Sequence, residues 1–225
     1  MHNRTMTRRA LLITGGALLA AAVVVGILAV TLSPDAKDGL DVFWNTVMSG
    51  IRQPWMLSIA YALNRIGGGW IAILLVPLLI IAALLLARRW RAAVFAAVAF
   101  IACAGLTQLL KHLYGRARPD DMLVPSDFGS FPSGHTSNAA VIAVVLWLVF
   151  PRVWVALIGV AWTLLMALSR TLLAVHWATD TFGGALVGAS AAFLVGAAFA
   201  RWASVGWGAP SPTPRSSRAA DPPLS

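Results

Sequence analysis

The chain has 225 residues, of which 59% are hydrophobic and 11% are charged, and its mean hydropathy is +0.80. Soluble domains carry about 25% charged residues, so this composition excludes an ordinary soluble protein and indicates that lipid surrounds most of the chain. The formal net charge of +9 could point to a nucleic-acid partner. The basic residues, however, lie in short clusters between apolar runs and form no continuous polar face, so we expect no nucleic-acid binding.

Six apolar segments indicate how the chain crosses the membrane. A bilayer core takes about 20 helical residues. Between the first two segments, residues 54–63 have the composition of a helix that lies along the membrane surface. The sequence therefore predicts an all-α, integral membrane six-helix bundle over residues 10–203, with an interfacial helix in the first outer loop. The six predicted spans are residues 10–32, 70–87, 92–110, 136–150, 153–175 and 182–200.

The distribution of Lys and Arg predicts the orientation. These residues accumulate in cytoplasmic loops, and they gather in the tail of residues 1–9, at residues 88–91 and near residue 201. We therefore expect both termini in the cytoplasm and the polar clusters outside. The tail of residues 204–225 is rich in Pro and Ser and should be disordered. The paired arginines before the first segment could mark a signal peptide, but that segment exceeds the usual core of roughly 7 to 15 residues, which favours a retained span.

Three polar clusters fall on the same predicted outer face. They read KHLYGRARP at residues 111–119, PSGH at 132–135 and SRTLLAVHWATD at 169–180. A cation at membrane depth costs roughly 2.5 to 3.5 kcal/mol on insertion scales, so it should face a polar cavity or an anionic ligand. With one acid among several cations, the clusters favour a multiply charged anion such as phosphate, which guanidinium groups bind through paired hydrogen bonds. The candidate phosphate-binding cations are Lys111, Arg118 and Arg170.

The third cluster contains a histidine with a carboxylate four residues later. On a helix, His176 and Asp180 would share one face. A carboxylate at one imidazole nitrogen fixes the tautomer and leaves the other nitrogen free to attack, so His176 is the candidate nucleophile and Asp180 its orienting residue. Arg170 precedes His176 by six residues and lies on another helical face. If both serve one site, the helix should break near residues 175–177.

The second cluster opens an apolar segment. Pro132, Ser133 and Gly134 lead into a predicted helix whose free N–H groups and positive dipole end can bind an anion. Gly134 would let the backbone approach that anion, and Ser133 could add its hydroxyl or cap the helix. His135, which has no nearby carboxylate in the sequence, is the candidate general acid that protonates a leaving oxygen. Taken alone, this cluster could equally be an ordinary helix cap.

With these residues, the sequence resembles the type 2 phosphatidic acid phosphatase superfamily. Its signature is a Lys, six residues and Arg-Pro; a Pro-Ser-Gly-His; and a Ser-Arg, five residues, a His, three residues and an Asp. The three clusters match every fixed position, and the six-span plan with a surface helix resembles the membrane branch of the family. The resemblance implies that Lys111, Arg118 and Arg170 hold the phosphate, with Ser133 and Gly134 assisting.

The resemblance also implies an activity. In the family, the residues matching His176, Asp180 and His135 are the nucleophile, the orienting residue and the general acid, and no metal or other cofactor is required. We therefore expect a membrane phosphatase that hydrolyses a lipid-linked phosphate monoester or pyrophosphate. Polyprenyl pyrophosphate, phosphatidylglycerol phosphate, phosphatidic acid and a polyprenyl phosphate-linked sugar phosphate are the candidate substrates. The Ala-, Val- and Arg-rich, Lys-poor composition suggests a bacterium with a GC-rich genome. We expect the protein in the cytoplasmic membrane, with the site on its outer face.

Two other functions compete with this hypothesis. A non-catalytic lipid or anion carrier could use the same cations, but binding alone needs no oriented imidazole. A haloperoxidase-like enzyme could share the site, but those members of the family are soluble. Outside the signature, we expect Arg116 only to bias the local potential, and Asp120, Asp121 and Asp127 to be solvated loop residues rather than metal ligands. The glycine-rich stretch 183–188 should mark close helix packing.

Overall fold

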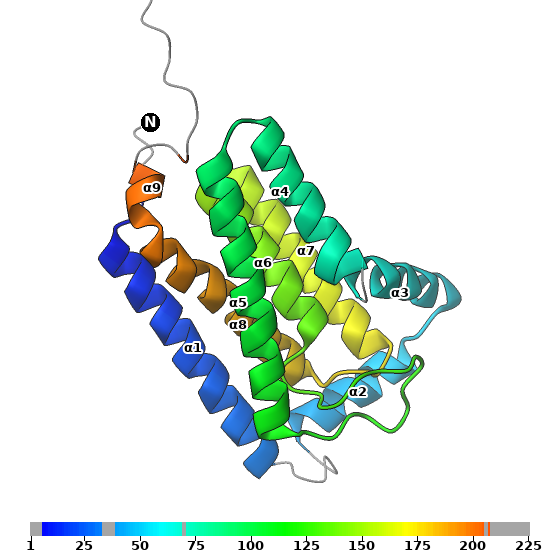
Figure 1. Cartoon of the computed structure of the whole chain (residues 1–225). Helices are drawn as coiled ribbons and strands as arrows, with labels where there is room; N and C mark the ends of the chain where they lie inside the picture. Colours follow the sequence, from blue (N-terminus) through cyan, green and yellow to red (C-terminus); the bar gives the residue numbers. More distant parts are fainter. Residues whose placement is uncertain (1–5, 33–38, 69–70, 205–206, 208–225) are drawn as a thin grey trace, which may run out of the picture.

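A computed structural model gives the fold of the protein (Figure 1). It describes residues 6–32, 39–68, 71–204 and 207. Every regular element within these residues is a helix, in agreement with the predicted all-α fold. In chain order the elements are α1 (Arg8–Thr31), α2 (Leu40–Gly50), α3 (Pro54–Gly67), the π-helical segment η1 (Ile71–Leu75), α4 (Val76–Leu86), α5 (Trp90–Tyr114), α6 (Gly134–Val149), α7 (Val153–Leu172), α8 (Ala178–Ala198) and α9 (Ala200–Ser204).

Helix α8 lies at the centre of the bundle. It packs against α1, α5 and α6, while α7 packs on α6 and α4 on α5 (Figure 1). Of the four longest apolar helices, α8 has the largest buried share. Its buried positions are mostly Gly, Ala and Ser, which let neighbouring backbones approach closely. The helix that carries Asp180 in its first turn is therefore enclosed on several sides.

Two glycines of α8 bring it into backbone contact with α6. A Cβ atom at Gly184 would lie 2.6 Å from the carbonyl oxygen of Ser133, and one at Gly188 would lie 2.1 Å from that of Ser137. No side chain fits at such distances, so the close packing predicted for residues 183–188 is confirmed. This contact ties the start of α6 to the start of α8, the two helix ends that carry candidate site residues.

The exposed surface and the helix lengths show a multi-pass membrane protein. Among the described residues, α1, α5, α7 and α8 are each long and apolar enough to cross a membrane. The pair formed by α3 and residues 71–86 also passes this test, with a bend of 53° at its break, and α6 is apolar but has 16 residues. Large apolar side chains such as Ile13 on α1 and Leu157 on α7 are exposed, which requires lipid around them.

The helix boundaries differ from the predicted spans mainly at the polar end of the bundle. Helix α5 continues beyond residue 110, so Lys111 lies in its last turn. Helix α8 begins four residues before the predicted position 182, because the Asp180 side chain accepts a hydrogen bond from the backbone at the helix start. Residues 54–63, predicted to form a surface helix, lie within α3, and their position at the membrane surface stays a prediction. Helix α2, in a stretch of mixed polarity, was not predicted.

The predicted disordered tail of residues 204–225 falls largely outside the described residues. Trp207 is described, and it is buried. Its ring stacks on Phe95 with the ring centroids 4.7 Å apart, and its Nε1–H donates to the Leu148 carbonyl oxygen at 3.1 Å. The ring of Trp207 gains from burial against the bundle. This contact concerns one residue, so disorder of the tail stays a prediction.

Candidate active site

Two cations of the first cluster meet at the loop between α5 and α6. Lys111 Nζ donates to the carbonyl oxygen of Gly129 at 2.7 Å, and Arg118 Nη2 donates to the same oxygen at 2.8 Å. Gly129 has φ of 69°, and a Cβ atom there would lie 3.0 Å from the Lys111 carbonyl oxygen, so this turn favours glycine. The turn holds the two cations side by side, although they come from a helix and from a loop.

Two acidic residues of this loop, Asp121 and Asp127, form ion pairs. Asp127 Oδ1 lies 3.3 Å from Lys111 Nζ and 2.7 Å from Arg118 Nη2. Burial raises the pKa of the Asp127 carboxyl, but the positive charges of Lys111 and Arg118 outweigh it, so this pKa lies below its ordinary value. Asp121 forms an ion pair with Arg52 at 3.0 Å. The prediction that Asp121 and Asp127 are solvated loop residues is confirmed by their exposed fractions of 42% and 59%, although each carboxylate also pairs with a cation.

The candidate nucleophile lies in the short connection between α7 and α8. Helix α7 ends at Leu172, and Ala174 in the connection has φ of 52°. The helix break expected between Arg170 and His176 is thus confirmed, slightly earlier than residues 175–177. The expectation that His176 and Asp180 share one helical face is wrong. Asp180 belongs to the first turn of α8, and the two residues meet across the start of that helix.

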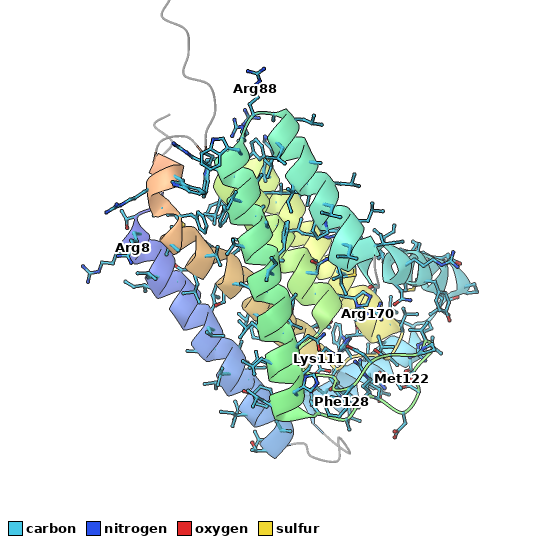
Figure 2. All side chains as sticks on the ribbon, viewed as in Figure 1. Arg8, Arg88, Lys111, Met122, Phe128 and Arg170 are labelled. Atoms are coloured by element: carbon cyan, nitrogen blue, oxygen red, sulfur yellow. The ribbon has the colours of Figure 1, made fainter. Side chains whose placement is uncertain are left out.

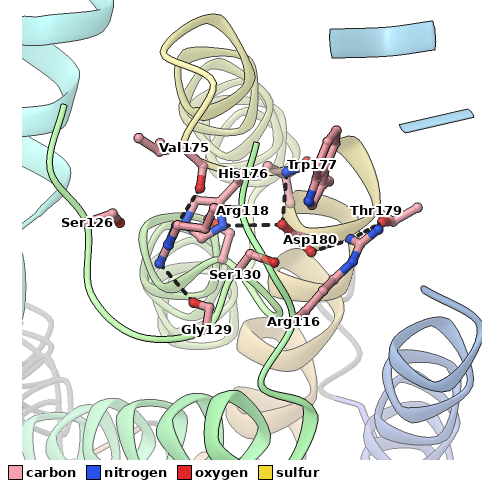
Figure 3. Close-up of polar contacts among 12 residues, drawn as sticks. Arg116, Arg118, Ser126, Gly129, Ser130, Val175, His176, Trp177, Thr179 and Asp180 are labelled. Atoms are coloured by element: carbon pink, nitrogen blue, oxygen red, sulfur yellow. Dashed lines mark hydrogen bonds and ion pairs between the residues drawn. The ribbon is translucent and has the colours of Figure 1, made fainter. Parts of the chain in front are cut away.

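The two ring nitrogens of His176 face different groups (Figure 3). Nδ1 lies 3.5 Å from Asp180 Oδ2, and Nε2 lies 3.3 Å from Arg118 Nη1. Asp180 Oδ2 also accepts the backbone N–H of Trp177 at 2.9 Å, which fixes the carboxylate. The distance to Nδ1 exceeds that of a good hydrogen bond, as is common for catalytic pairs without substrate. Nδ1 is thus directed at the Asp180 carboxylate and Nε2 at the Arg118 guanidinium.

The electrostatic surroundings keep His176 neutral. The side chain is 3% exposed. Burial, together with the positive charges of Arg118, Lys111 and Arg170, holds the pKa of His176 well below its ordinary value. Burial likewise lowers the pKa of Arg118, against the opposite effect of Asp127. A neutral imidazole is the form that has a lone pair for attack.

The start of α6 carries the second cluster. The Ser133 backbone N–H donates to the Asp180 carbonyl oxygen at 2.9 Å, and the Ser133 Oγ accepts from Thr136 Oγ1 at 3.2 Å. Of the two roles expected for the Ser133 hydroxyl, capping is not observed. A Cβ atom at Gly134 would have Thr107 as its nearest neighbour, at 3.9 Å. Packing within the protein therefore does not explain the glycine at this position.

His135 and Arg170 meet at a residue that the sequence did not indicate. Arg170, in the last turn of α7, is 1% exposed, and its Nη1 donates to Asn64 Oδ1 at 2.7 Å. His135 Nε2 lies 3.4 Å from the carbonyl oxygen of Asn64. Asn64 belongs to α3, far from both partners in the sequence, so no local pattern could have identified it. The end of α3 covers this part of the site.

A largely apolar cavity of about 360 Å³ opens beside His135. Its walls come from α3, α4, α6 and α7, and they include Ile142, Trp154, Trp162 and Met166. Pockets of this size and character receive the apolar parts of ligands. His135 therefore lies between the cationic residues and an apolar space.

The eight predicted site residues lie in one region of the molecule. Figure 2 shows Lys111 and Arg170 at the same end of the bundle, and the contacts above connect the remaining residues to them. Arg116 also belongs to this region, since its Nη1 donates to Asp180 Oδ1 at 2.6 Å. The expectation that Arg116 only biases the local potential is therefore wrong. Within the described ranges, no three His, Cys, Asp or Glu side chains converge as metal ligands do.

The fold and the site together define an all-helical membrane protein. Its site has a cationic cup, formed by Lys111, Arg118 and Arg170, beside the His176–Asp180 pair. The family model of the PAP2 superfamily matches residues 92–203. Phosphatidylglycerophosphatase B of Bacillus subtilis is 32% identical over 181 residues, which cover 75% of this chain and 88% of that protein. Decaprenylphosphoryl-5-phosphoribose phosphatase of Mycobacterium tuberculosis is 32% identical over 151 residues, covering 64% of this chain and 81% of that protein.

The solved structures agree with these relatives. The crystal structure of a transmembrane PAP2 type phosphatidylglycerolphosphate phosphatase from Bacillus subtilis matches with a TM-score of 0.70 and 26% identity, over 81% of this chain and 94% of that chain. This chain belongs to the PAP2 superfamily. Because its relatives are named phosphatases, it is a phosphate-ester hydrolase of the membrane lipid phosphatase family.

Proposed function

We propose that this protein hydrolyses a lipid-linked phosphate monoester or pyrophosphate through a phosphohistidine intermediate on His176. One observation carries the proposal: His176 directs Nδ1 at the Asp180 carboxylate and Nε2 at the Arg118 guanidinium. This is the arrangement that an oriented nucleophile needs beside a bound phosphate. A protein that only bound anions would gain nothing from a neutral imidazole among its cations.

In the first step, the lone pair of His176 Nε2 attacks the phosphorus atom. Lys111, Arg118 and Arg170 hold the phosphate oxygens and stabilise the charge on them in the transition state. As the P–N bond forms, the bond from phosphorus to the lipid-side oxygen breaks. His135 donates its proton to that leaving oxygen, so the departing group is neutralised.

In the second step, water hydrolyses the phosphohistidine. His135, which has lost its proton, takes one from the water molecule while the water oxygen attacks phosphorus. The P–N bond breaks, the electron pair returns to Nε2, and inorganic phosphate leaves. Asp180 keeps the ring orientation constant through both steps because it remains beside Nδ1.

The apolar cavity beside His135 supports a lipid substrate. We place the lipid chain in this cavity, because a leaving group that is protonated by His135 must extend away from the cup on that side. The relatives act, by their names, on phosphatidylglycerophosphate and on a decaprenyl-linked phosphate. The substrates proposed here are therefore phosphatidylglycerol phosphate, phosphatidic acid, polyprenyl pyrophosphate and a polyprenyl phosphate-linked sugar phosphate.

We also propose six membrane crossings over residues 10–203, with both termini in the bacterial cytoplasm and the site on the outer face. Figure 2 supports this orientation, since Arg8 and Arg88 lie at the end of the bundle opposite to Lys111 and Arg170. Basic side chains at the first end follow the positive-inside rule, whereas Lys111 and Arg170 at the second end are candidate phosphate-binding residues.

A phosphate-release assay tests the proposal. The purified protein in detergent, with EDTA present, should release phosphate from at least one of the four lipids above. A His176→Asn variant should release none, because it lacks the attacking nitrogen. If the wild-type protein released no phosphate from any of the four lipids, the proposed function would be wrong. Lipid transport that survived combined substitution of His135, His176 and Asp180 would instead favour a carrier.

A further inference from the structure

The carboxylate that faces His176 has a second oxygen with its own partner. Asp180 is fully buried, and while its Oδ2 faces His176 and Trp177, its Oδ1 accepts from Arg116 Nη1 at 2.6 Å (Figure 3). The Arg116 side chain is 3% exposed. A charge-assisted hydrogen bond this short, away from water, constrains both the position and the charge of the carboxylate.

The second terminal nitrogen of the Arg116 guanidinium, Nη2, contacts helix α2. Arg116 Nη2 donates to Asp41 Oδ2 at 2.7 Å. Asp41 in turn accepts from the Thr179 backbone N–H at 3.0 Å and from the Thr179 hydroxyl at 2.5 Å. The contacts thus run from α2 through Asp41, Arg116 and Asp180 to His176. Thr179, next to Asp180 in the sequence, closes this network.

Arg116 reaches the reacting ring through Asp180. The described hydrogen bonds of its guanidinium are with Asp41, Thr179 and Asp180, and none goes to His176 or to Lys111, Arg118 or Arg170. Without the guanidinium, the carboxylates of Asp41 and Asp180 would have no cation between them. Two buried carboxylates in that situation favour protonation of one of them.

The state of Asp180 determines which nitrogen of His176 can attack. A carboxylate accepts a hydrogen bond from Nδ1–H and leaves the lone pair on Nε2, whereas a protonated or rotated carboxyl would not select this tautomer. We propose that Arg116, held by Asp41 of α2, is a positioning residue that sets the orientation and charge of Asp180, and thereby the tautomer of His176. This inference rests on the proposed nucleophilic role of His176.

A double-mutant cycle tests the inference with the lipid of the panel above that the wild-type protein hydrolyses fastest. Arg116→Ala should lower kcat by about 10²-fold, as loss of partners that orient ligating or reacting groups does. KM and the inhibition constant of inorganic phosphate should stay within about twofold, because the cup is intact. In an Asp180→Asn background, Arg116→Ala should lower kcat by less than about threefold, since the two residues act as a unit.

Two further variants keep the result interpretable. Asp41→Asn retains Arg116 and the side-chain volume, and it should lower kcat by about tenfold at constant KM, even if Arg116→Ala folds poorly. Arg52→Ala is the matched control. Arg52 also forms an ion pair between distant segments, with Asp121, and donates to the Leu172 carbonyl oxygen, but it has no described contact with Asp180. Its kcat should stay within about twofold of the wild-type value.

A spectroscopic readout separates this inference from the proposed function. In ¹⁵N-histidine-labelled protein in lipid bilayers at pH 7, His176 should be protonated on Nδ1, with its signal assigned from the His176→Asn variant. Arg116→Ala should lose that tautomer. The inference fails if the tautomer is unchanged in Arg116→Ala, or if Arg116→Ala lowers kcat by the same factor with and without Asp180. Absence of any phosphate release by the wild-type protein would instead contradict the proposed function.

Discussion

The two histidines of the site have different surroundings. His176 is buried among charged groups, with Asp180 at one ring nitrogen and Arg118 at the other. His135 is half-buried, lies near a backbone carbonyl oxygen and borders an apolar cavity. The charged surroundings suit a group that attacks a bound phosphate, whereas the apolar surroundings suit a group that protonates a departing lipid. Under the proposed mechanism, the phosphate group would therefore bind on the His176 side of the phosphorus atom and the lipid chain on the His135 side.

The largest expected effect comes from exchanging the two histidines for alanine. His176→Ala should lower kcat by about 10⁴-fold, because it removes the nucleophile. His135→Ala should lower kcat by about 10²- to 10³-fold. The loss should be smaller with a pyrophosphate than with a monoester, because phosphate is the better leaving group. The rate of phosphate release from each substrate measures both losses. Equal losses for the two variants on both substrates would contradict the different roles.

A substitution in the apolar cavity should separate lipid binding from phosphate chemistry. Ile142→Trp fills part of the cavity and should lower kcat/KM for a long-chain lipid phosphate by about tenfold. Hydrolysis of p-nitrophenyl phosphate, which has no lipid chain, should not change. Ile101→Trp is the control, because Ile101 is exposed on α5 outside the cavity. Equal losses on both substrates would show that the cavity does not receive the chain.

Removal of the negative charge of Asp127, beside the cup, should strengthen phosphate binding. The Asp127 carboxylate contacts Lys111 and Arg118, so a phosphate group must compete with it for these cations. Asp127 is 59% exposed, and exposed pairs contribute about 0.2 to 1 kcal/mol. Asp127→Asn should therefore lower the inhibition constant of inorganic phosphate by up to about fivefold. A higher constant would show that Asp127 positions the cations instead of competing for them.

A further expected effect is on stability at acidic pH. The pKa of His176 is lowered in the folded state. Below about pH 6.5, His176 therefore becomes protonated in the unfolded chain but stays neutral in the folded protein. Stability should therefore fall as the pH is lowered, by at most about 1.4 kcal/mol per pH unit from this group. The melting temperature of His176→Asn should fall less between pH 7 and pH 5 than that of the wild type. Parallel curves would contradict a neutral, buried His176.

The sequence predicted those parts of the site that depend on local spacing. The three clusters, the helix break before His176 and the close packing of residues 183–188 all follow from patterns of a few residues. The helical pairing of His176 with Asp180 was predicted wrongly, because the polar first turn of α8 lies outside the apolar run that marks the span. A hydropathy pattern does not detect a helix start that is stabilised by a side-chain cap.

The residues that sequence analysis missed depend on contacts between distant segments. Asn64 meets Arg170 and His135, and Asp41 meets Arg116, only because α2 and α3 fold over the end of the bundle. The one sequence feature that could have pointed to this contact was Asp41, an acidic residue in a segment of mixed polarity. Its distance in sequence from the three signature clusters is not fixed, so the sequence alone could not link it to Arg116. Such contacts require the tertiary arrangement of the helices.

The most direct test of the phosphohistidine mechanism is to trap the intermediate. A lipid substrate carrying ³²P in its terminal phosphate would be mixed with the protein, quenched in alkali within milliseconds and digested for mapping. The proposed mechanism predicts label on the peptide that contains His176 in the wild-type protein and in Arg52→Ala, and none in His176→Asn. Label that persisted in His176→Asn, or that mapped to His135, would contradict attack by His176.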